Sequence, residues 1–410
     1  MNDEFSDFRR RVRSFLSSNL PAGWAGVGAL SDSERADFLP RWREVLHEHR
    51  YLGISWPASY GGAGLTAAEQ HVVQEEFVQA GAPLLPLPSD LFNLALLGPT
   101  LLVCGTEEQK EHFIPRMLRG EYRFAQGFSE PDAGSDLFSL RTRAVLVDSE
   151  WVINGQKVWQ TDADAANWLF VLARTEPDAP RAKGISMLLV PMEQAGVLVR
   201  PIRTMTGEAE FCEVFFDDAR TAAAHVVGGR GGGAAATMTL LGFERGAASG
   251  SLYAQYRVEL DRLVRLIRDR GRARDAGIRQ RLGWCHTQVE AIRFLSLRAL
   301  ARAQQGHPPG PESSMIKLHE STYHAVLTEL AMDVLGPTGL VRTGAPAVSS
   351  LGPDPLGAPN TPAAWQHVYM TSRAATIYGG SSQIQRNTLG ERVLGLPRDP
   401  RPESPARGNG

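Results

Sequence analysis

The chain has 410 residues, of which 43% are hydrophobic and 21% are charged, and its formal net charge is −2 at pH 7. This length allows two or three domains, and the composition is typical of a globular protein. The near-neutral charge gives no indication of nucleic acid or an acidic membrane as the main partner. The three cysteines, Cys104, Cys212 and Cys285, lie far apart without a CxxC pair, which argues against a disulfide framework and against a metal site of the zinc type.

The N-terminal residues begin with Met-Asn-Asp-Glu and contain no apolar core, so they do not resemble a secretory signal peptide. No stretch approaches the roughly 20 apolar residues that a membrane-spanning helix needs. We therefore expect a cytoplasmic protein without a membrane span.

Residues 1–121 are predicted to form an N-terminal helical domain. Residues 3–20 carry apolar side chains at helical spacing, and a second helix is expected over 38–52. Serine or threonine followed three residues later by glutamate or glutamine predicts a helix start. This pattern occurs at Ser31–Glu34, Thr66–Glu69 and Thr106–Gln109.

Residues 122–230 are predicted to form a middle β-domain, because the hydrophobic period changes to two. The short, regular spacing of the strands favours a β-barrel or a sandwich. Asp148-Ser149 separates two of the strands, and Asn154-Gly155 is read as a further hairpin signal. The expected strands cover residues 123–128, 139–147, 150–159, 167–173, 184–191, 196–203 and 211–217.

Residues 231–397 are predicted to be helical again. The glycine-rich stretch 228–233 before them could cradle a phosphate, but without a strand-loop-lysine arrangement a flexible connection between domains is favoured. Residues 336–362 are expected to form a long loop and 398–410 a disordered tail. The expected helices cover 234–269, 275–305, 312–335, 362–378 and 382–394.

This order of helices, β-domain and helices predicts an α+β protein and is neither a βαβ nucleotide fold nor a TIM barrel. A cofactor would be expected between domains, which is a common place for such sites.

Two stretches of the β-domain combine polar and aromatic groups in turns or strands. In Phe128-Ser-Glu-Pro-Asp-Ala-Gly-Ser-Asp136, Ser129 and Ser135 offer donors to a ligand, although a plain Pro-Asp turn would leave the same pattern. In the stretch 154–161, Trp159 and Thr161 would point to the same side of a strand. A planar heterocycle could stack on the indole, or Trp159 could be a core residue.

Tyr378-Gly-Gly-Ser-Ser-Gln-Ile-Gln-Arg-Asn387 places a glycine pair before a helix. Ser381 or Ser382 can cap that helix, and its free N–H groups favour an anion such as a diphosphate. An ordinary glycine turn with a serine cap remains the alternative.

Glu244 lies in an apolar helical segment, Leu240–Ala248. The residues three and four positions away are leucine or alanine and offer it no partner. In a cleft, desolvation would raise the pKa of this carboxylate and suit it to proton abstraction. A Glu244–Arg245 pair at a solvated edge is the alternative.

Together, five motifs resemble those of the acyl-CoA dehydrogenase family of flavoproteins, and the similarity runs from about residue 5 to residue 397. The motifs are "FSEPDAGSD" (128–136), "INGQKVWQTDA" (153–163), "GEAEFCEVFFDDAR" (207–220), "LLGFERG" (240–246) and "YGGSSQIQRNTLGERVLGLP" (378–397). The resemblance implies an N-terminal helical domain, a middle β-barrel domain and a C-terminal four-helix bundle. It also implies FAD between the β-domain and the bundle, with a neighbouring subunit of a homodimer or homotetramer completing the site.

The resemblance also assigns roles to individual residues by motif position. Ser129, Trp159 and Thr161 would contact the flavin ring, and Ser381 and Gln383 the FAD diphosphate and adenosine. Ser135 would lie beside the pantetheine arm of the substrate, and Arg245 would flank the acyl cavity. The family's Arg-x-x-Phe-Gly sequence, which holds the FAD diphosphate across subunits, is missing, and Arg268 is the candidate replacement for its arginine. Gln160, Asp162 and Asp333 also depart from the residues common in the family.

The catalytic base follows from one further departure. Many members carry the base directly after the tyrosine of the last motif, where this chain has Gly379. A second set, resembling isovaleryl-CoA dehydrogenase, carries it on the first long helix of the bundle, at the position of Glu244. Glu244 would then remove the α-proton, flavin N5 would accept the β-hydride, and the Gly379 N–H and a flavin ribityl hydroxyl would polarise the thioester carbonyl.

The expected product is a 2,3-enoyl thioester, and the expected electron acceptor is an electron-transfer flavoprotein. The acyl group could be short, branched or a steroid side chain, and its carrier could be CoA or a carrier protein. Two other interpretations stay open, a flavin-dependent oxidase or monooxygenase on the same fold and a non-catalytic subunit of a heteromeric dehydrogenase.

Overall fold

The computed structural model describes residues 5–247, 252–307, 310–341 and 351–398, without the side chains of residues 181 and 244–247. The N-terminal region is helical, as predicted. Its helices are α1 (Ser6–Asn19), α2 (Asp32–Glu48), α3 (Ala67–Ala80), α4 (Pro88–Asp90), α5 (Gly98–Cys104) and α6 (Glu107–Leu118), with a π-helical turn at Leu91–Leu97 between α4 and α5. The three predicted caps are confirmed, because Ser31, Thr66 and Thr106 each accept the backbone N–H of the residue three positions on.

The middle region forms one eight-stranded sheet. Its strands are β1 (Phe124–Gly127), β2 (Arg143–Val147), β3 (Glu150–Thr161), β4 (Trp168–Arg174), β5 (Ile185–Pro191), β6 (Val197–Ile202), β7 (Phe211–Ala222) and β8 (Val226–Val227). The strand order is β6-β7-β3-β2-β4-β5-β8, and β1 pairs in parallel with β4. Strands β4 and β5 are buried almost throughout, because helices cover them on the outside of the sheet.

The prediction of a hairpin turn at Asn154-Gly155 is wrong, because both residues lie inside β3. The turn between β2 and β3 is Asp148-Ser149, with Asp148 in the left-handed region at φ 55°. Asn154 instead donates a side-chain hydrogen bond of 2.8 Å to Asp218. At Gly155 a Cβ atom would lie 2.6 Å from the Thr142 hydroxyl, so the glycine allows a close approach at a β-bulge.

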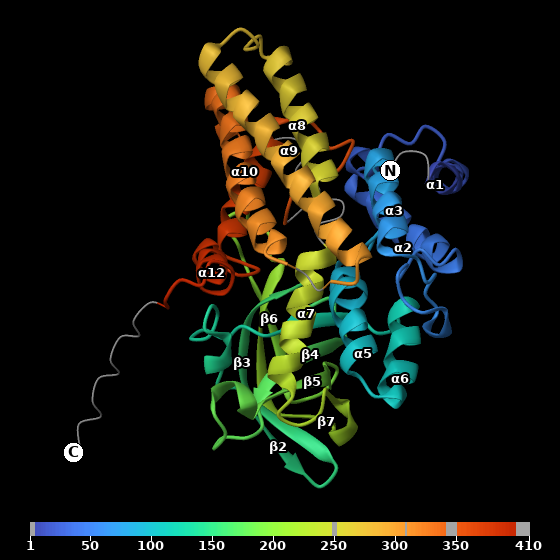
Figure 1. Ribbon diagram of the computed structural model, residues 1–410, viewed down its shortest axis with the longest axis vertical. Helices are drawn as coiled ribbons and strands as arrows, with labels where there is room; N and C mark the ends of the chain where they lie inside the picture. Colours follow the sequence, from blue (N-terminus) through green and yellow to red (C-terminus); the bar gives the residue numbers. More distant parts are fainter. Residues whose placement is uncertain (1–4, 248–251, 308–309, 342–350, 399–410) are drawn as a thin grey trace, which may run out of the picture.

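The C-terminal region contains α7 (Gly233–Ala247), α8 (Leu252–Asp269), α9 (Ala276–Gln304), α10 (Glu312–Leu335), α11 (Pro362–Ser372) and α12 (Ser382–Asn387). The predicted single helix over 234–269 is described as two helices, and residues 248–251 between them lie outside the described residues. The two helices pack on different partners. Helix α7 lies against β5 and α5, whereas α8 packs on α9 and α10 in the bundle (Figure 1).

The segment 351–361 ties the bundle to the N-terminal domain. Arg262 of α8 donates a hydrogen bond of 2.5 Å to the fully buried Asp354. Two residues after Asp354, the Leu356 carbonyl accepts a hydrogen bond of 3.0 Å from the Gly28 N–H. Leu356 also lies so close to Gly26 that a Cβ atom there would be 2.2 Å from its carbonyl oxygen. These contacts fix the two helical regions relative to each other.

Three apolar clusters form the core. One joins the N-terminal helices to β4, β5 and α7, a second fills the bundle, and the third lies inside the sheet. Among the described helices, none is long and apolar enough to cross a membrane.

Candidate functional site

The loop after β1 is bonded directly to β3. The Ser129 carbonyl accepts a hydrogen bond of 3.0 Å from the Val158 N–H. The Lys157 ammonium donates to the Phe128 carbonyl at 3.0 Å and to the Glu130 carboxylate at 2.8 Å. These bonds place Ser129 next to the strand segment that carries Trp159, so the structure brings these two predicted residues together.

The Glu130–Lys157 ion pair was missed from the sequence. Lys157 is fully buried, and Glu130 also accepts the N–H groups of Arg141 and Thr142 at 2.6 and 2.9 Å. Burial lowers the pKa of Lys157 to about 8. Burial raises the pKa of Glu130, but the nearby ammonium and the hydrogen bonds outweigh it and hold that pKa below its usual value. The sequence did contain an indication of this burial. Lys157 is six residues from the buried Trp151 on β3, and side chains an even number of positions apart on a strand point to the same side.

Trp159 sits on a second β-bulge. Val158 pairs with Glu213 and Gln160 with Cys212, so Trp159 has no partner on β7. It adopts a left-handed φ of 68°, and 59% of its surface is exposed. The interpretation of Trp159 as a core residue is therefore wrong. The centroid of its indole lies 5.9 Å from that of the Phe211 ring, in an edge-to-face arrangement. The rest of the indole surface is free to stack on a ligand.

Beyond the bulge, Thr161 is half-buried at the end of β3 and pairs with Phe211. Asp162 follows in a second left-handed conformation, with φ 50°, and its N–H donates to the Glu210 carbonyl at 2.7 Å. Burial raises the pKa of Asp162 to about 6, and the carboxylates of Asp164 and Glu210 add to the shift. Two left-handed residues other than glycine within four positions are typical of a functional site.

The glycine pair before α12 is held by a buried glutamine. Gly379 and Gly380 adopt φ values of 63° and 85°, which glycine tolerates best. The Gln385 amide donates to their carbonyl groups at 3.2 and 3.3 Å. Ser381, rather than Ser382, caps α12 by accepting the Ile384 N–H at 3.3 Å, and Gln383 is exposed.

The backbone of α7 includes Glu244 and Arg245, but their side chains lie outside the described part of the structure. Helix α10 contacts both α7 and α12, so the two segments that carry Glu244 and Gly379 adjoin one common helix. Ser135 is exposed on the loop after β1.

Arg268 is not brought to these residues within one chain. It is exposed in the last turn of α8, at the end of the bundle farthest from the sheet (Figure 1). Asp333, on α10, forms an ion pair with Arg281.

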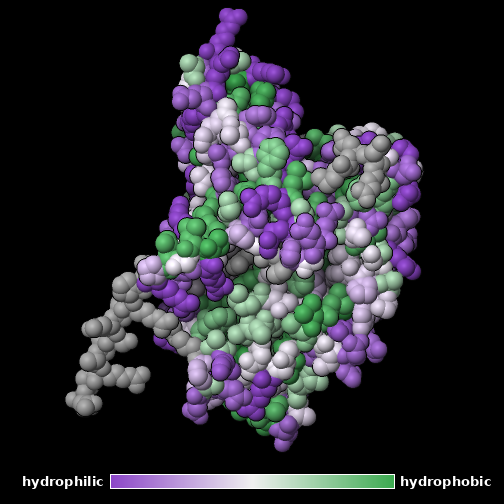
Figure 2. All heavy atoms as spheres, viewed as in Figure 1, coloured by the Kyte–Doolittle hydropathy of each residue, from purple (hydrophilic) through white to green (hydrophobic). Residues whose placement is uncertain are grey.

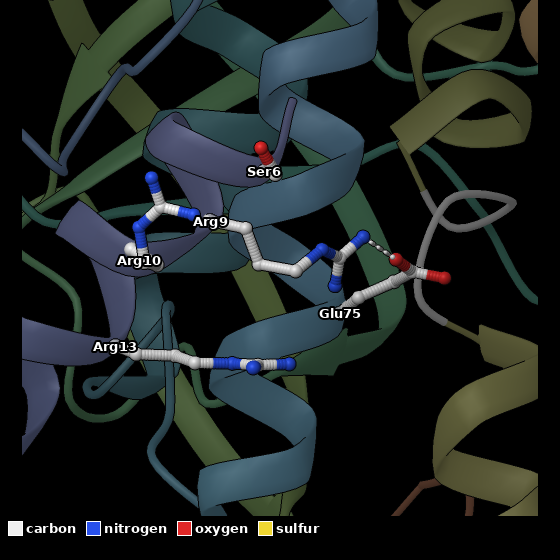
Figure 3. Close-up of a pocket in the computed structure, with 5 residues that line it drawn as sticks. All are labelled: Ser6, Arg9, Arg10, Arg13 and Glu75. Carbon is white, nitrogen blue, oxygen red and sulfur yellow. Dashed lines mark hydrogen bonds and ion pairs between the residues drawn. The ribbon is translucent and has the colours of Figure 1, made fainter. Parts of the chain in front are cut away.

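Two cavities stand out in the described structure, and none of the predicted site residues lines either of them. The first, of about 640 Å³, is lined by Ser6, Arg9, Arg10, Arg13 and Glu75. Figure 3 shows Arg9 reaching from α1 to Glu75 on α3, at a distance of 2.7 Å. Burial raises the pKa of Glu75, but hydrogen bonds from His71, Tyr253 and Arg9 lower it to about 2. Each arginine of this cavity has an ion-pair partner, Arg9 with Glu75 and Glu76, Arg13 with Glu76, and Arg10 with Asp7.

The second cavity, of about 490 Å³, lies between α1, α3 and Leu356. Both cavities are on the N-terminal domain, away from β3 and α12. Among the described side chains, no cluster of three or more His, Cys, Asp or Glu residues could hold a metal ion.

The order of an N-terminal helical region, a middle β-sheet and C-terminal helices is that of the acyl-CoA dehydrogenase fold. Three family models match the chain in this order. The N-terminal domain of acyl-CoA dehydrogenase matches residues 2–121, the middle domain 125–219 and the C-terminal domain 231–394. The chain belongs to the acyl-CoA dehydrogenase family and is an oxidoreductase, and the expected fold class is confirmed. Members of this family are FAD flavoproteins, so the cofactor is FAD.

Individual relatives extend the comparison over the full length. Acyl-CoA dehydrogenase IpdE1 of Mycobacterium tuberculosis is 41% identical over 400 residues, which cover 97% of this chain and 99% of that protein. The solved structure of the Tcur3481-Tcur3483 steroid ACAD has a TM-score of 0.77 at 29% identity, covering 96% of this chain and 98% of that one. The ChsE4-ChsE5 complex from Mycobacterium tuberculosis gives a TM-score of 0.76 at 28% identity, covering 97% and 99%.

Proposed function

We propose that this chain catalyses α,β-dehydrogenation of an acyl-CoA thioester to the 2,3-enoyl thioester, with Glu244 as the base. The observation that carries the proposal is the backbone of Gly379. Its φ of 63° suits glycine, and a glutamate there would have a strained backbone. Glu244 lies on α7, which adjoins the same helix, α10, as the Gly379 segment. The base would therefore come from α7.

The residues around the bulge of β3 fit a flavin. Trp159 offers an exposed indole face, and Ser129 lies beside it through the bond between its carbonyl and Val158. Thr161 supplies a half-buried hydroxyl, while Ser381 and Gln383 at the start of α12 would face the diphosphate and adenosine. When bound, FAD supplies the hydride acceptor.

On the substrate side, this chain's own groups bind and polarise the thioester. The Gly379 N–H would donate to the thioester carbonyl and stabilise the negative charge that develops when Glu244 takes the α-proton. Ser135, exposed on its loop, would contact the pantetheine arm, and Arg245 would flank the acyl cavity.

For the acyl group we propose a steroid-derived CoA thioester, since a solved neighbour at 29% identity is described as a steroid ACAD. For the electron acceptor we propose an electron-transfer flavoprotein. A carrier-protein thioester is the alternative substrate, and a cytoplasmic location stays a prediction.

We further propose that the working enzyme has more than one subunit. Ile377, Val393, Leu394 and Leu396 are 48–71% exposed on the segment around α12, and Figure 2 shows apolar atoms gathered there. Arg268, remote from its own sheet, could meet FAD only in a neighbouring chain. A heteromer is a specific alternative to a homodimer or homotetramer, because two solved neighbours are named as pairs of proteins.

The test is bleaching of the bound flavin by a panel of acyl thioesters, run on the wild type and on Glu244→Gln. The panel contains butanoyl-CoA, isovaleryl-CoA and a steroid side-chain CoA. Loss of the base should slow flavin reduction about 10²–10⁴-fold, whereas Glu44→Gln, on the exposed face of α2, should leave it unchanged.

Equal rates for Glu244→Gln and the wild type would refute the assignment of the base. Rapid reoxidation of the dithionite-reduced protein by air, without another acceptor, would support an oxidase instead. A purified chain that cannot be reconstituted with FAD would support a non-catalytic subunit of a heteromer.

A further inference from the structure

Lys317 on α10 makes two contacts with charged or aromatic groups near the Gly379 segment. Its ammonium lies 4.3 Å from the centroid of the Tyr378 ring and 3.2 Å from the Glu320 carboxylate. Only 16% of its side chain is exposed. A cation over the face of an aromatic ring is attracted by the ring's electrons, and the attraction strengthens as water is excluded.

Tyr378 directly precedes Gly379, and the residue is 37% exposed. The contact with Lys317 adds a restraint on the position of its ring. The amide of Gln385, which is 1% exposed, holds the carbonyl groups of Gly379 and Gly380 from the other side. The backbone between these two anchors carries the Gly379 N–H.

We propose that Lys317 is a positioning residue that acts through Tyr378 to aim the Gly379 N–H at the thioester carbonyl. This inference rests on the proposed function. A backbone donor stabilises a developing oxyanion only when its direction is fixed before the reaction. Two glycines in succession make this backbone unusually free, so its direction must come from neighbouring side chains. Lys317 supplies that restraint from the helix that also adjoins α7.

An ordinary helix-surface ion pair would look similar in one respect, because Lys317 and Glu320 are three residues apart. Lys110 on α6 offers a comparison, because its side chain is 15% exposed and pairs at 2.8 Å with Glu107, also three residues away. Glu107 is 67% exposed, against 14% for Glu320, and accepts a hydrogen bond of 2.5 Å from the Tyr60 hydroxyl. Lys110→Met therefore measures the cost of losing a lysine–glutamate pair of the same spacing on another helix.

The experiment compares the wild type with Lys317→Met, Lys317→Arg and Lys110→Met, all in the FAD-bound enzyme. Methionine keeps the packing of the lysine stem and removes the charge, whereas arginine keeps a cation for the ring. The probe is the thioester of the acyl-CoA panel that bleaches the wild-type flavin fastest. We expect Lys317→Met to lower the limiting rate of flavin reduction about tenfold, because a small misalignment of a catalytic group is costly. The half-saturating thioester concentration should change less than about twofold, since the substitution removes no interaction that binds the ground state and the transition state equally.

Two further results are expected. Lys317→Arg should recover most of the rate, and Lys110→Met should match the wild type. The carbonyl infrared stretch of the bound enoyl-CoA product should shift less in Lys317→Met than in the wild type, because the carbonyl is less polarised. FAD content and the melting temperature should stay at wild-type values.

A Lys317→Met rate equal to that of Lys110→Met would overturn the inference and leave the proposed function standing. No recovery in Lys317→Arg, or a loss of FAD in Lys317→Met, would overturn it in favour of a purely structural role. If no thioester bleaches the wild-type flavin, the proposed function fails, and this inference fails with it.

Discussion

Replacing Lys157 by methionine tests how the β-domain holds the loop after β1. The substitution keeps the length of the side chain but removes the hydrogen bonds of 2.8 Å to Glu130 and 3.0 Å to the Phe128 carbonyl. Glu130, 8% exposed, is then left as a buried carboxylate without its cation. Removing one partner of a buried ion pair costs about 3–5 kcal/mol.

The lower end of that range applies here, because Glu130 keeps its hydrogen bonds from the backbone N–H groups of Arg141 and Thr142. With an unfolding entropy of about 2.1 cal/mol/K per residue, a loss of about 3 kcal/mol corresponds to a fall of about 3–4 °C in the melting temperature when all 410 residues unfold together. Thermal unfolding followed by circular dichroism measures this shift on the full chain. The exposed Lys183 provides the control, and Lys183→Met should change stability by less than about 0.5 kcal/mol.

The double variant Lys157→Met with Glu130→Gln separates the ion pair from simple packing. It leaves no buried charge, but the two backbone N–H groups reach different oxygens of Glu130, and the single carbonyl oxygen of glutamine can accept only one of them. We therefore expect it to recover part of the loss. A melting temperature for Lys157→Met within about 1 °C of the wild type would refute the reasoning, as would a double variant no more stable than the single one.

Three other predictions concern charge and pH. The folded pKa of Asp162, about 6, lies above its ordinary value of 3.8, so its contribution to stability is present at low pH and lost as pH rises through about 6. The wild type should therefore lose more thermal stability than Asp162→Asn between about pH 4 and about pH 7. The folded pKa of Glu75, about 2, lies below 4.5, so its contribution is present above pH 4.5 and lost as pH falls through about 2; acid unfolding should be steeper in the wild type than in Glu75→Gln. Arg262→Met leaves the fully buried Asp354 without its cation and should cost about 3–5 kcal/mol in urea unfolding; a cost below about 1 kcal/mol would contradict the assignment of this pair.

Local signals predicted most of the elements. A capping box such as Ser31–Glu34 is complete within four residues, so its outcome does not depend on the rest of the fold. Helix α10 covers the predicted residues 312–335 for a similar reason, because its apolar pattern is long and periodic. The fold class followed from the order of these elements together with the family motifs.

Features that depend on contacts between distant residues were not predicted. Asn154-Gly155 has the local chemistry of a turn, but its place in β3 is decided by Asp218 and Thr142, which lie on other segments. The bulge at Trp159 is set by its register with β7, which strand periodicity cannot show. Helix α7 packs against the sheet and α8 against the bundle, which their helical patterns alone do not show.

The candidate site shows how these two kinds of information combine. The family motifs gave its residues one at a time, and the backbone shows what holds the parts together. Ser129 and Trp159 adjoin because Lys157 and Val158 bond the loop after β1 to β3. The Gly379 segment belongs to the C-terminal region, where α10 and Gln385 hold it. In the proposed function, a thioester carbonyl polarised by Gly379 has to be aligned with a flavin on Trp159 across two domains. The rigidity of each anchor should then contribute to the rate beside the base, with about a tenfold effect expected for Lys317 and about 10²–10⁴-fold for Glu244.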